Sequence, residues 1–188
     1  MVDLPTAEAL AAAGPVTATR LGLDFYRRDV LEVAPRLLGL WLCHRVGPDI
    51  RRGRITEVEA YRGQSDTACH ARVGRTKRTE VLYLGGGHAY VYLCYGLHHL
   101  VNVVTGPPDQ PQAALIRGIE GHAGPGRLTK ALDITLDNNR EDLTTSPDLW
   151  LEDDGRRPAR IDAGRRVGIG YASAADQARL WRWYVAAV

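Results

Sequence analysis

The chain has 188 residues, of which 45% are hydrophobic and 24% are charged, a length and composition that suit one globular domain. Its formal net charge is only +2, so the total charge gives no sign of a polyanionic partner. Three cysteines, Cys43, Cys69 and Cys94, are odd in number and lack a CxxC spacing, which argues against a disulfide framework or a zinc site and favours buried free thiols.

The first residues are rich in alanine and show no sustained period, so we expect residues 1–16 to form a flexible arm and residues 17–188 a single domain. The start also carries Asp3 and Glu8 and only a brief Leu-Ala run, which fits neither a signal peptide nor a membrane span. We therefore expect a cytoplasmic protein.

The next segments alternate between helix and strand signals. Asp29 is a helix-start residue, and Pro35 has to fall in the first two turns, so the sequence predicts a short helix that stops at Gly39. Residues 40–46 and 53–61 are predicted strands. In the second strand a period of two places Ile55, Glu57, Glu59 and Tyr61 on one face, which makes Glu59 and Tyr61 neighbours.

Residues 64–72, "QSDTACHAR", begin with two good helix caps, Ser65 and Asp66. A helix here would set His70 one turn above Asp66, so that both face one cleft. Two arginine-rich clusters, at 51–54 and 72–78, supply planar guanidinium groups that suit phosphates.

Residues 88–104 are predicted to form a hairpin about a tight Tyr95-Gly96 bend, with Tyr90, Tyr92 and Cys94 on one face and Asn102 among valines. Residues 112–120 form a further strand, where burial of Arg117 implies a carboxylate partner. Short helices are expected over 124–132 and 173–180, and a strand over 181–187. Strands outnumber helices and their links are short, which predicts an α+β fold on an antiparallel or mixed sheet.

Three kinds of site could use Glu59, Asp66 and His70. The first is a hydrolytic metal site, although no HExxH spacing is present. The second is purely structural: Glu59 pairs with Arg117 in the sheet and His70 is a satisfied core residue. The third is a metal-free general base with aromatic side chains that hold a flat substrate.

Six stretches, in this order, resemble the alkyladenine DNA glycosylase (3-methyladenine DNA glycosylase) family: "RGRITEVEAY", "DTACHA", "YVYLCYGLHHLVNVV", "ALIRGIE", "GPGRLTKAL" and "RVGIGYA". With the opening "TRLGLDFY", the resemblance covers roughly residues 17–186. It implies a single domain with a curved, mainly antiparallel sheet, short flanking helices and a DNA-intercalating hairpin. The implied activity is excision of alkylated purines from double-stranded DNA by base flipping and hydrolysis of the N-glycosidic bond.

The resemblance also implies residue roles. Glu59 would activate water, Arg117 would hold the water and the scissile nucleotide, and the Val167 carbonyl would complete the water site. Tyr95 would be the wedge left in the duplex. The base pocket would comprise Tyr61, His70, Tyr92 and Asn102. Outside the resemblance, the charge pattern suggests phosphate contacts from Arg75, Lys77 and Arg78, and a backbone contact from His98.

Departures from the family pattern include Val58 between the two glutamates and a much shorter segment at 120–124, which predicts fewer DNA contacts. No lysine lies in the Glu59 motif, so we expect a monofunctional enzyme without strand cleavage. We further expect a monomer without metal or cofactor, associated with the nucleoid through DNA. The rival hypothesis is a non-catalytic nucleic-acid-binding module of the same fold.

Overall fold

The computed structural model describes residues 17–186, so the arm expected over 1–16 lies outside the described residues. Helices, including 3-10 turns labelled η, are α2 (Leu23–Tyr26), α3 (Val30–Leu37), η1 (His70–Val73), η2 (Glu80–Tyr83), α4 (Pro125–Leu132), η3 (Leu136–Asn138) and α5 (Ala174–Ala178). Strands are β1 (Thr19–Arg20), β2 (Trp41–Val46), β3 (Asp49–Arg62), β4 (Ala89–Cys94), β5 (His98–Thr105), β6 (Gln112–Ile119), β7 (His122–Ala123), β8 (Leu149–Asp153), β9 (Ile161–Gly164) and β10 (Arg182–Val185).

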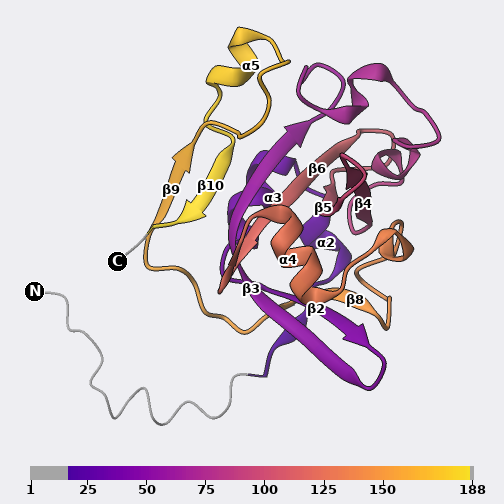
Figure 1. Cartoon of the computed structure of the whole chain (residues 1–188), viewed down its shortest axis with the longest axis vertical. Helices are drawn as coiled ribbons and strands as arrows, with labels where there is room; N and C mark the ends of the chain where they lie inside the picture. Colours follow the sequence, from indigo (N-terminus) through magenta and orange to yellow (C-terminus); the bar gives the residue numbers. More distant parts are fainter. Residues whose placement is uncertain (1–16, 187–188) are drawn as a thin grey trace, which may run out of the picture.

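The strands of the described residues form one open sheet in which each ladder is antiparallel, so the α+β prediction is confirmed. Its main path runs β1-β8-β2-β3-β6-β5-β4. β10 branches off β3 and carries β9, and Figure 1 shows this pair to one side, with α5 beyond it. β1, β7, β8 and β9 were not expected from the sequence, because most are short and lack a clear alternation.

The spine of the sheet is β3, which has 14 residues and pairs with β2 along its first half and with β6 and β10 along its second. Its ladder with β6 shifts register between Ile55 and Val58, a β-bulge. Ile55 therefore packs in the main core with Val58 and Ala60, so its predicted place on the face of Glu59 is wrong. Glu59 and Tyr61 do share a face, as predicted.

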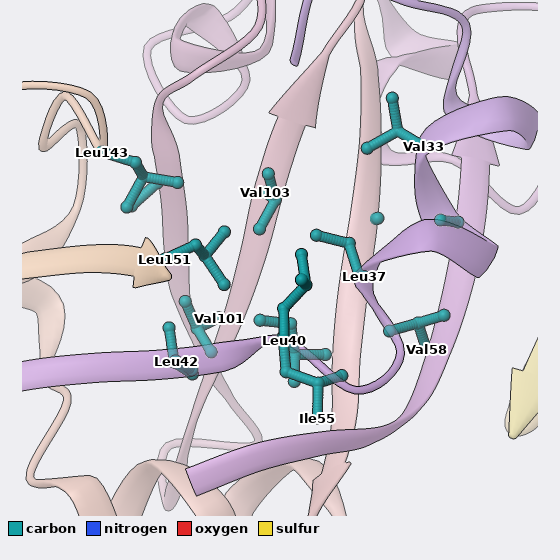
Figure 2. Packing of buried hydrophobic residues seen from close by; sticks show 14 of the residues in the cluster. Val33, Leu37, Leu40, Leu42, Ile55, Val58, Val101, Val103, Leu143 and Leu151 are labelled. Atoms are coloured by element: carbon teal, nitrogen blue, oxygen red, sulfur yellow. The ribbon is translucent and has the colours of Figure 1, made fainter. Parts of the chain in front are cut away.

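One hydrophobic core joins α3 to the inner face of the sheet. Figure 2 shows Val33 and Leu37 of α3 near Val58 of β3 and Val103 of β5. The Asp29 carboxylate caps α3 by accepting from the Leu31 amide, and the helix ends two residues before Gly39, whose φ is 89°. The predicted start and stop of this short helix are confirmed.

The hairpin of β4 and β5, helix α4 and helix α5 with its Ser173 cap also match the predictions. The helix expected over 64–72 is wrong: residues 63–69 form turns, and only η1 follows, capped by the Cys69 sulfur. The Asp66 side chain instead accepts from the amides of Arg62 and Ala68, a local pattern that competes with helix formation. No helix within the described part of the chain is long and apolar enough to cross a membrane.

Candidate active site

Glu59 is the one carboxylate of β3 that is fully buried. Its Oε1 accepts from the backbone amide of Val167 at 2.7 Å, and its Oε2 accepts from the Tyr61 hydroxyl at 2.8 Å. Val167 was expected to contribute its carbonyl, whereas the contact in this structure comes from its amide. A carboxylate has about four acceptor positions, so a water molecule can still bind Glu59.

Arg117 of β6 lies on the same side of β3. Its Nε is 3.1 Å from Glu57 Oε1 and 3.4 Å from Glu59 Oε1, so the carboxylate partner that the sequence implied is a pair of glutamates. Arg182 of β10 also binds Glu57 at 3.0 Å. Two guanidinium groups therefore balance two carboxylates at this point of the sheet.

Burial nevertheless dominates the ionisation of Glu59. Desolvation raises the pKa of this carboxyl above its ordinary value, although Arg117, the Val167 amide and the Tyr61 hydroxyl each act to lower it. Burial, and then the neighbouring Glu59 carboxylate, hold the pKa of Tyr61 well above its usual range, so its hydroxyl remains a donor. A carboxylate with a raised pKa beside a hydrogen-bond donor is suited to accept a proton from water.

A cavity lies next to Tyr61, the residue whose hydroxyl binds Glu59. Its walls include all four residues expected in a base pocket: Tyr61, His70, Tyr92 and Asn102. Leu82, a departure from the family pattern that indicates a change in the wall, also lines the cavity. Five lining residues were not predicted: Ala68, Cys69, Tyr90, Ala113 and Tyr171. The resemblance implies Tyr92 but not Tyr90, for which the strand period favours a core position; Tyr90 is buried and also forms part of the cavity wall. Glu59 and Arg117 do not line the cavity; Tyr61 connects them to it.

Aromatic rings crowd one wall of this cavity. The His70 and Tyr92 ring centroids are 4.8 Å apart at 74°, and His70 Nδ1 lies 2.9 Å from the Tyr90 hydroxyl. Burial, with Arg78 and Arg72 nearby, lowers the pKa of His70 to about 4. His70 is therefore neutral at pH 7 and does not repel a positively charged ring system.

Asn102 is buried in β5 and reaches the cavity from the sheet. Its side-chain amide nitrogen donates to the Tyr90 carbonyl at 3.0 Å. This hydrogen bond fixes the orientation of the amide, so that Asn102 presents a rigid polar edge beside the aromatic side chains of the wall.

Tyr95 stands at the tip of the β4–β5 hairpin, with 94% of its surface exposed. Its φ is 50°, followed by 68° at Gly96, and the Leu97 amide closes the turn onto the Cys94 carbonyl at 3.1 Å. Left-handed backbone is unfavourable for tyrosine. The exposed ring therefore has no packing role within residues 17–186, and its role as a wedge stays a prediction.

The residues predicted to contact phosphates differ in the contacts that they make within this structure. The Arg75 guanidinium forms an ion pair with Asp109 and lies 4.5 Å above the Tyr83 ring. The Arg78 guanidinium lies 5.2 Å from the Tyr92 ring at the cavity wall. Lys77 and His98 are exposed. Arg75 would have to break its ion pair with Asp109 to reach a phosphate. Lys77 does not take part in that ion pair.

The metal hypothesis finds no support between residues 17 and 186, where no group of three His, Cys, Asp or Glu side chains is placed to hold an ion. Cys69 lines the cavity, but burial raises its pKa to about 11, so it is a thiol at neutral pH rather than a nucleophilic thiolate. Contacts of the purely structural hypothesis are present, since Arg117 lies beside Glu59 and His70 is hydrogen-bonded. Because His70 also lines an open cavity, that hypothesis does not account for the whole arrangement.

Known proteins resemble this chain over most of its length. The sequence profile of the methylpurine-DNA glycosylase family matches residues 24–123 and 121–188. A protein of Borrelia garinii subsp. bavariensis is 40% identical over 173 residues, covering 86% of this chain and 93% of that protein. A protein of Myxococcus xanthus is 45% identical over 170 residues, covering 84% and 87%. Both are named "Putative 3-methyladenine DNA glycosylase".

Proposed function

Because the chain belongs to the methylpurine-DNA glycosylase family, we propose that it is a DNA glycosylase that removes alkylated purines, such as 3-methyladenine, from double-stranded DNA. The observation that carries this proposal is the buried Glu59, held by Val167, Tyr61 and Arg117 next to a cavity with aromatic walls. A general base, a pocket with aromatic walls and an exposed wedge are the three parts that this chemistry needs.

Base flipping supplies access to the reacting bond. The glycosidic carbon is out of reach inside a duplex, and extrusion of the nucleotide costs a few kcal/mol. Tyr95, exposed at the hairpin tip, fills the space that the base leaves, as apolar wedges do in other DNA-bending proteins. The extruded base then enters the cavity between Tyr61 and the pair His70 and Tyr92.

The aromatic walls favour a damaged base over a normal one. Alkylated purines carry positive charge, and attraction to a ring face is worth on the order of 1 kcal/mol per ring. His70 adds no opposing charge, because its lowered pKa keeps it neutral. Asn102, with its amide fixed by Tyr90, discriminates against the exocyclic amino group of ordinary guanine.

Hydrolysis then needs one proton transfer. Glu59 takes a proton from water as the water oxygen bonds to the sugar carbon, and the carbon–nitrogen bond breaks with its electron pair going to the base. The ionised carboxylate also stabilises the positive charge that develops on the sugar. An alkylated base that is already cationic leaves without a general acid, so a monofunctional, metal-free enzyme acting as a monomer suffices.

The test is single-turnover release of base from methylated duplex DNA in the presence of a chelator, comparing the native protein with Glu59→Gln. We expect metal-independent release by the native protein and a loss of about 10²–10⁴-fold in the variant, the usual contribution of a general base. Both proteins should bind the damaged duplex. Binding by both without release would favour the non-catalytic module, and loss of native activity in chelator would favour a metal-dependent hydrolase.

A further inference from the structure

Asp66 and Arg166 form a buried ion pair that the proposed chemistry does not use. The side chains of both are completely buried, and two hydrogen bonds of 2.6 and 2.9 Å join the guanidinium to the two carboxylate oxygens. Burying two charges is costly unless the geometry is favourable, so a pair of this kind often serves specificity of structure more than stability. The position of the Asp66–Arg166 pair indicates which part of the structure it orders.

The pair ties together three segments around Glu59. Arg166 Nη1 also donates to the Ala60 carbonyl at 2.9 Å, which holds it to β3 directly after Glu59. Asp66 accepts from the amides of Arg62 and Ala68, which fixes the turn leading from Tyr61 to the cavity wall. The residue after Arg166 is Val167, whose amide donates to Glu59 at 2.7 Å.

Arg166 also supports the aromatic wall from outside the cavity. Its guanidinium carbon lies 4.9 Å from the centroid of the Tyr61 ring and 5.1 Å from that of Trp181, while Arg166 is absent from the cavity lining. Tyr61 therefore has Arg166 beside its ring and Glu59 at its hydroxyl. Movement of one arginine would disturb both hydrogen-bond donors of the carboxylate.

We infer that Asp66 and Arg166 are positioning residues for the reaction: together they hold the Val167 amide and the Tyr61 hydroxyl on Glu59, and so set how readily that carboxylate accepts a proton. This inference rests on the proposed function. Neither residue touches the substrate, because neither lines the cavity; both act through Glu59.

The direction of the effect follows from the groups that face Glu59. These are Glu57 and Tyr61 of β3, Arg117 of β6, Arg182 of β10 through Glu57, and the segment of Arg166 and Val167. Burial raises the pKa of Glu59; Arg117 lowers it most, and the Val167 amide and the Tyr61 hydroxyl, the two groups that the pair holds, lower it further. Loosening them makes ionised Glu59 less favourable, which moves the acidic limit of activity to higher pH.

The test compares the pH profile of single-turnover base release for the native protein and Asp66→Asn, which keeps the shape of the side chain and removes its charge. We expect the acidic limb of Asp66→Asn to lie at higher pH and its plateau rate to fall by about tenfold to hundredfold, as displaced catalytic groups do. Affinity for the damaged duplex should change less than the rate.

Asp154→Asn is the matched control. Asp154 also accepts two hydrogen bonds from one guanidinium, that of Arg54, at 3.1 and 2.7 Å, but Arg54 lies five residues before Glu59 on β3. Its loss should leave the acidic limb in place. If Asp66→Asn shifts only the melting temperature, and its limb and plateau match those of the native protein, the positioning role is wrong.

Arg166→Lys serves if Asp66→Asn does not fold, because lysine keeps the charge and loses the paired hydrogen bonds. It should shift the limb in the same direction, and an unshifted limb in a folded Arg166→Lys protein overturns the inference. A ¹³C NMR titration of the Glu59 carboxyl in native and variant protein measures the same change in pKa without an activity assay. A native protein that releases no base contradicts the proposed function, whereas the titration still tests the positioning of Glu59.

Discussion

The two ends of β3 use charge in opposite ways. In its first half, Arg54 binds Asp154 and the Gly39 carbonyl, and its guanidinium also lies 4.2 Å from the Trp41 ring. Near its end, Glu59 has comparable partners, with an amide, a hydroxyl and an arginine within reach. Asp154 keeps 13% of its side chain exposed and Glu59 keeps none.

This difference in burial reverses the direction of the pKa shift. Arg54 holds the pKa of Asp154 well below its usual range, whereas desolvation holds the pKa of Glu59 above its own. The first carboxylate stabilises the fold in its charged form. The second is kept in a place that opposes its charge, which is how functional sites obtain bases that titrate nearer to neutral pH. A structural carboxylate bound by Arg54 of β3 thus differs from Glu59, which lies on β3 itself and is the reactive carboxylate of the proposed function.

The largest expected effect is on the pH dependence of activity. In the proposed mechanism Glu59 acts in its ionised form, so the rate of base release should fall about tenfold for each pH unit below its raised pKa. We expect the acidic limb above the ordinary range of a glutamate, measured by single-turnover release across the acid range. Asp154→Asn should give the same limb. A limb at ordinary glutamate pKa would show that DNA binding removes the desolvation of Glu59 or that another group limits the rate.

The pH dependence of stability should have opposite signs for Asp154 and Glu59. The pKa of Asp154 is depressed in the fold, so its stabilisation is present above its unfolded pKa and is lost as pH falls. Asp154→Asn should therefore cost about 1–2 kcal/mol at pH 7, or a few degrees of melting temperature. The pKa of Glu59 is raised, so its ionisation reduces stability as pH rises through its pKa, and Glu59→Gln should melt no lower than native. Thermal melts from about pH 3 to pH 7 check both signs, because the Asp154 contribution is lost only below its unfolded pKa of about 4.

Sequence patterns identified the strand that carries Glu59 but not the β-bulge within it. Alternation placed Glu59 beside Tyr61 correctly, yet it also placed Ile55 there, because a bulge has no signature in the pattern of side chains. The Tyr95-Gly96 bend and the Arg117 partner were predictable because turn chemistry and the cost of a buried charge are local rules.

The surroundings of the site depended on long-range contacts that no local pattern indicates. Asp66 was assigned to a helix cap, but Arg166, 100 residues later, takes that carboxylate. Tyr171 joins the cavity wall from the same distant loop. An aromatic residue four positions after Val167 was the available signal for it, once Val167 had been placed at the site.

Tyr171 allows a smaller test of the reactive end of the molecule. Its hydroxyl donates to the Ala68 carbonyl at 2.9 Å and its ring forms part of the cavity wall, although 60% of the residue is exposed. Tyr171→Ala should weaken binding of a methylated duplex by about five- to tenfold, since one ring contact is worth on the order of 1 kcal/mol. Tyr171→Phe keeps the ring and should bind nearly as the native protein does. Equal losses in both variants would assign the effect to the hydroxyl instead.

The smallest expected effect is on the salt dependence of DNA binding, and it tests which end of β3 faces DNA. Exposed cations lie near both ends, with Arg52 in the β2–β3 hairpin and Lys77 in the loop beyond η1. The Arg52 guanidinium lies 4.7 Å from the Trp41 ring, in the same cluster as Arg54. If the cavity end faces the duplex, Lys77→Met should reduce the slope of log affinity against log salt by about 1, and Arg52→Met should leave it unchanged. The slopes come from binding titrations at several salt concentrations with undamaged and methylated duplexes. An equal reduction in both variants would mean that DNA follows β3 along its whole length, and the structural end of the strand would then also be part of the interface.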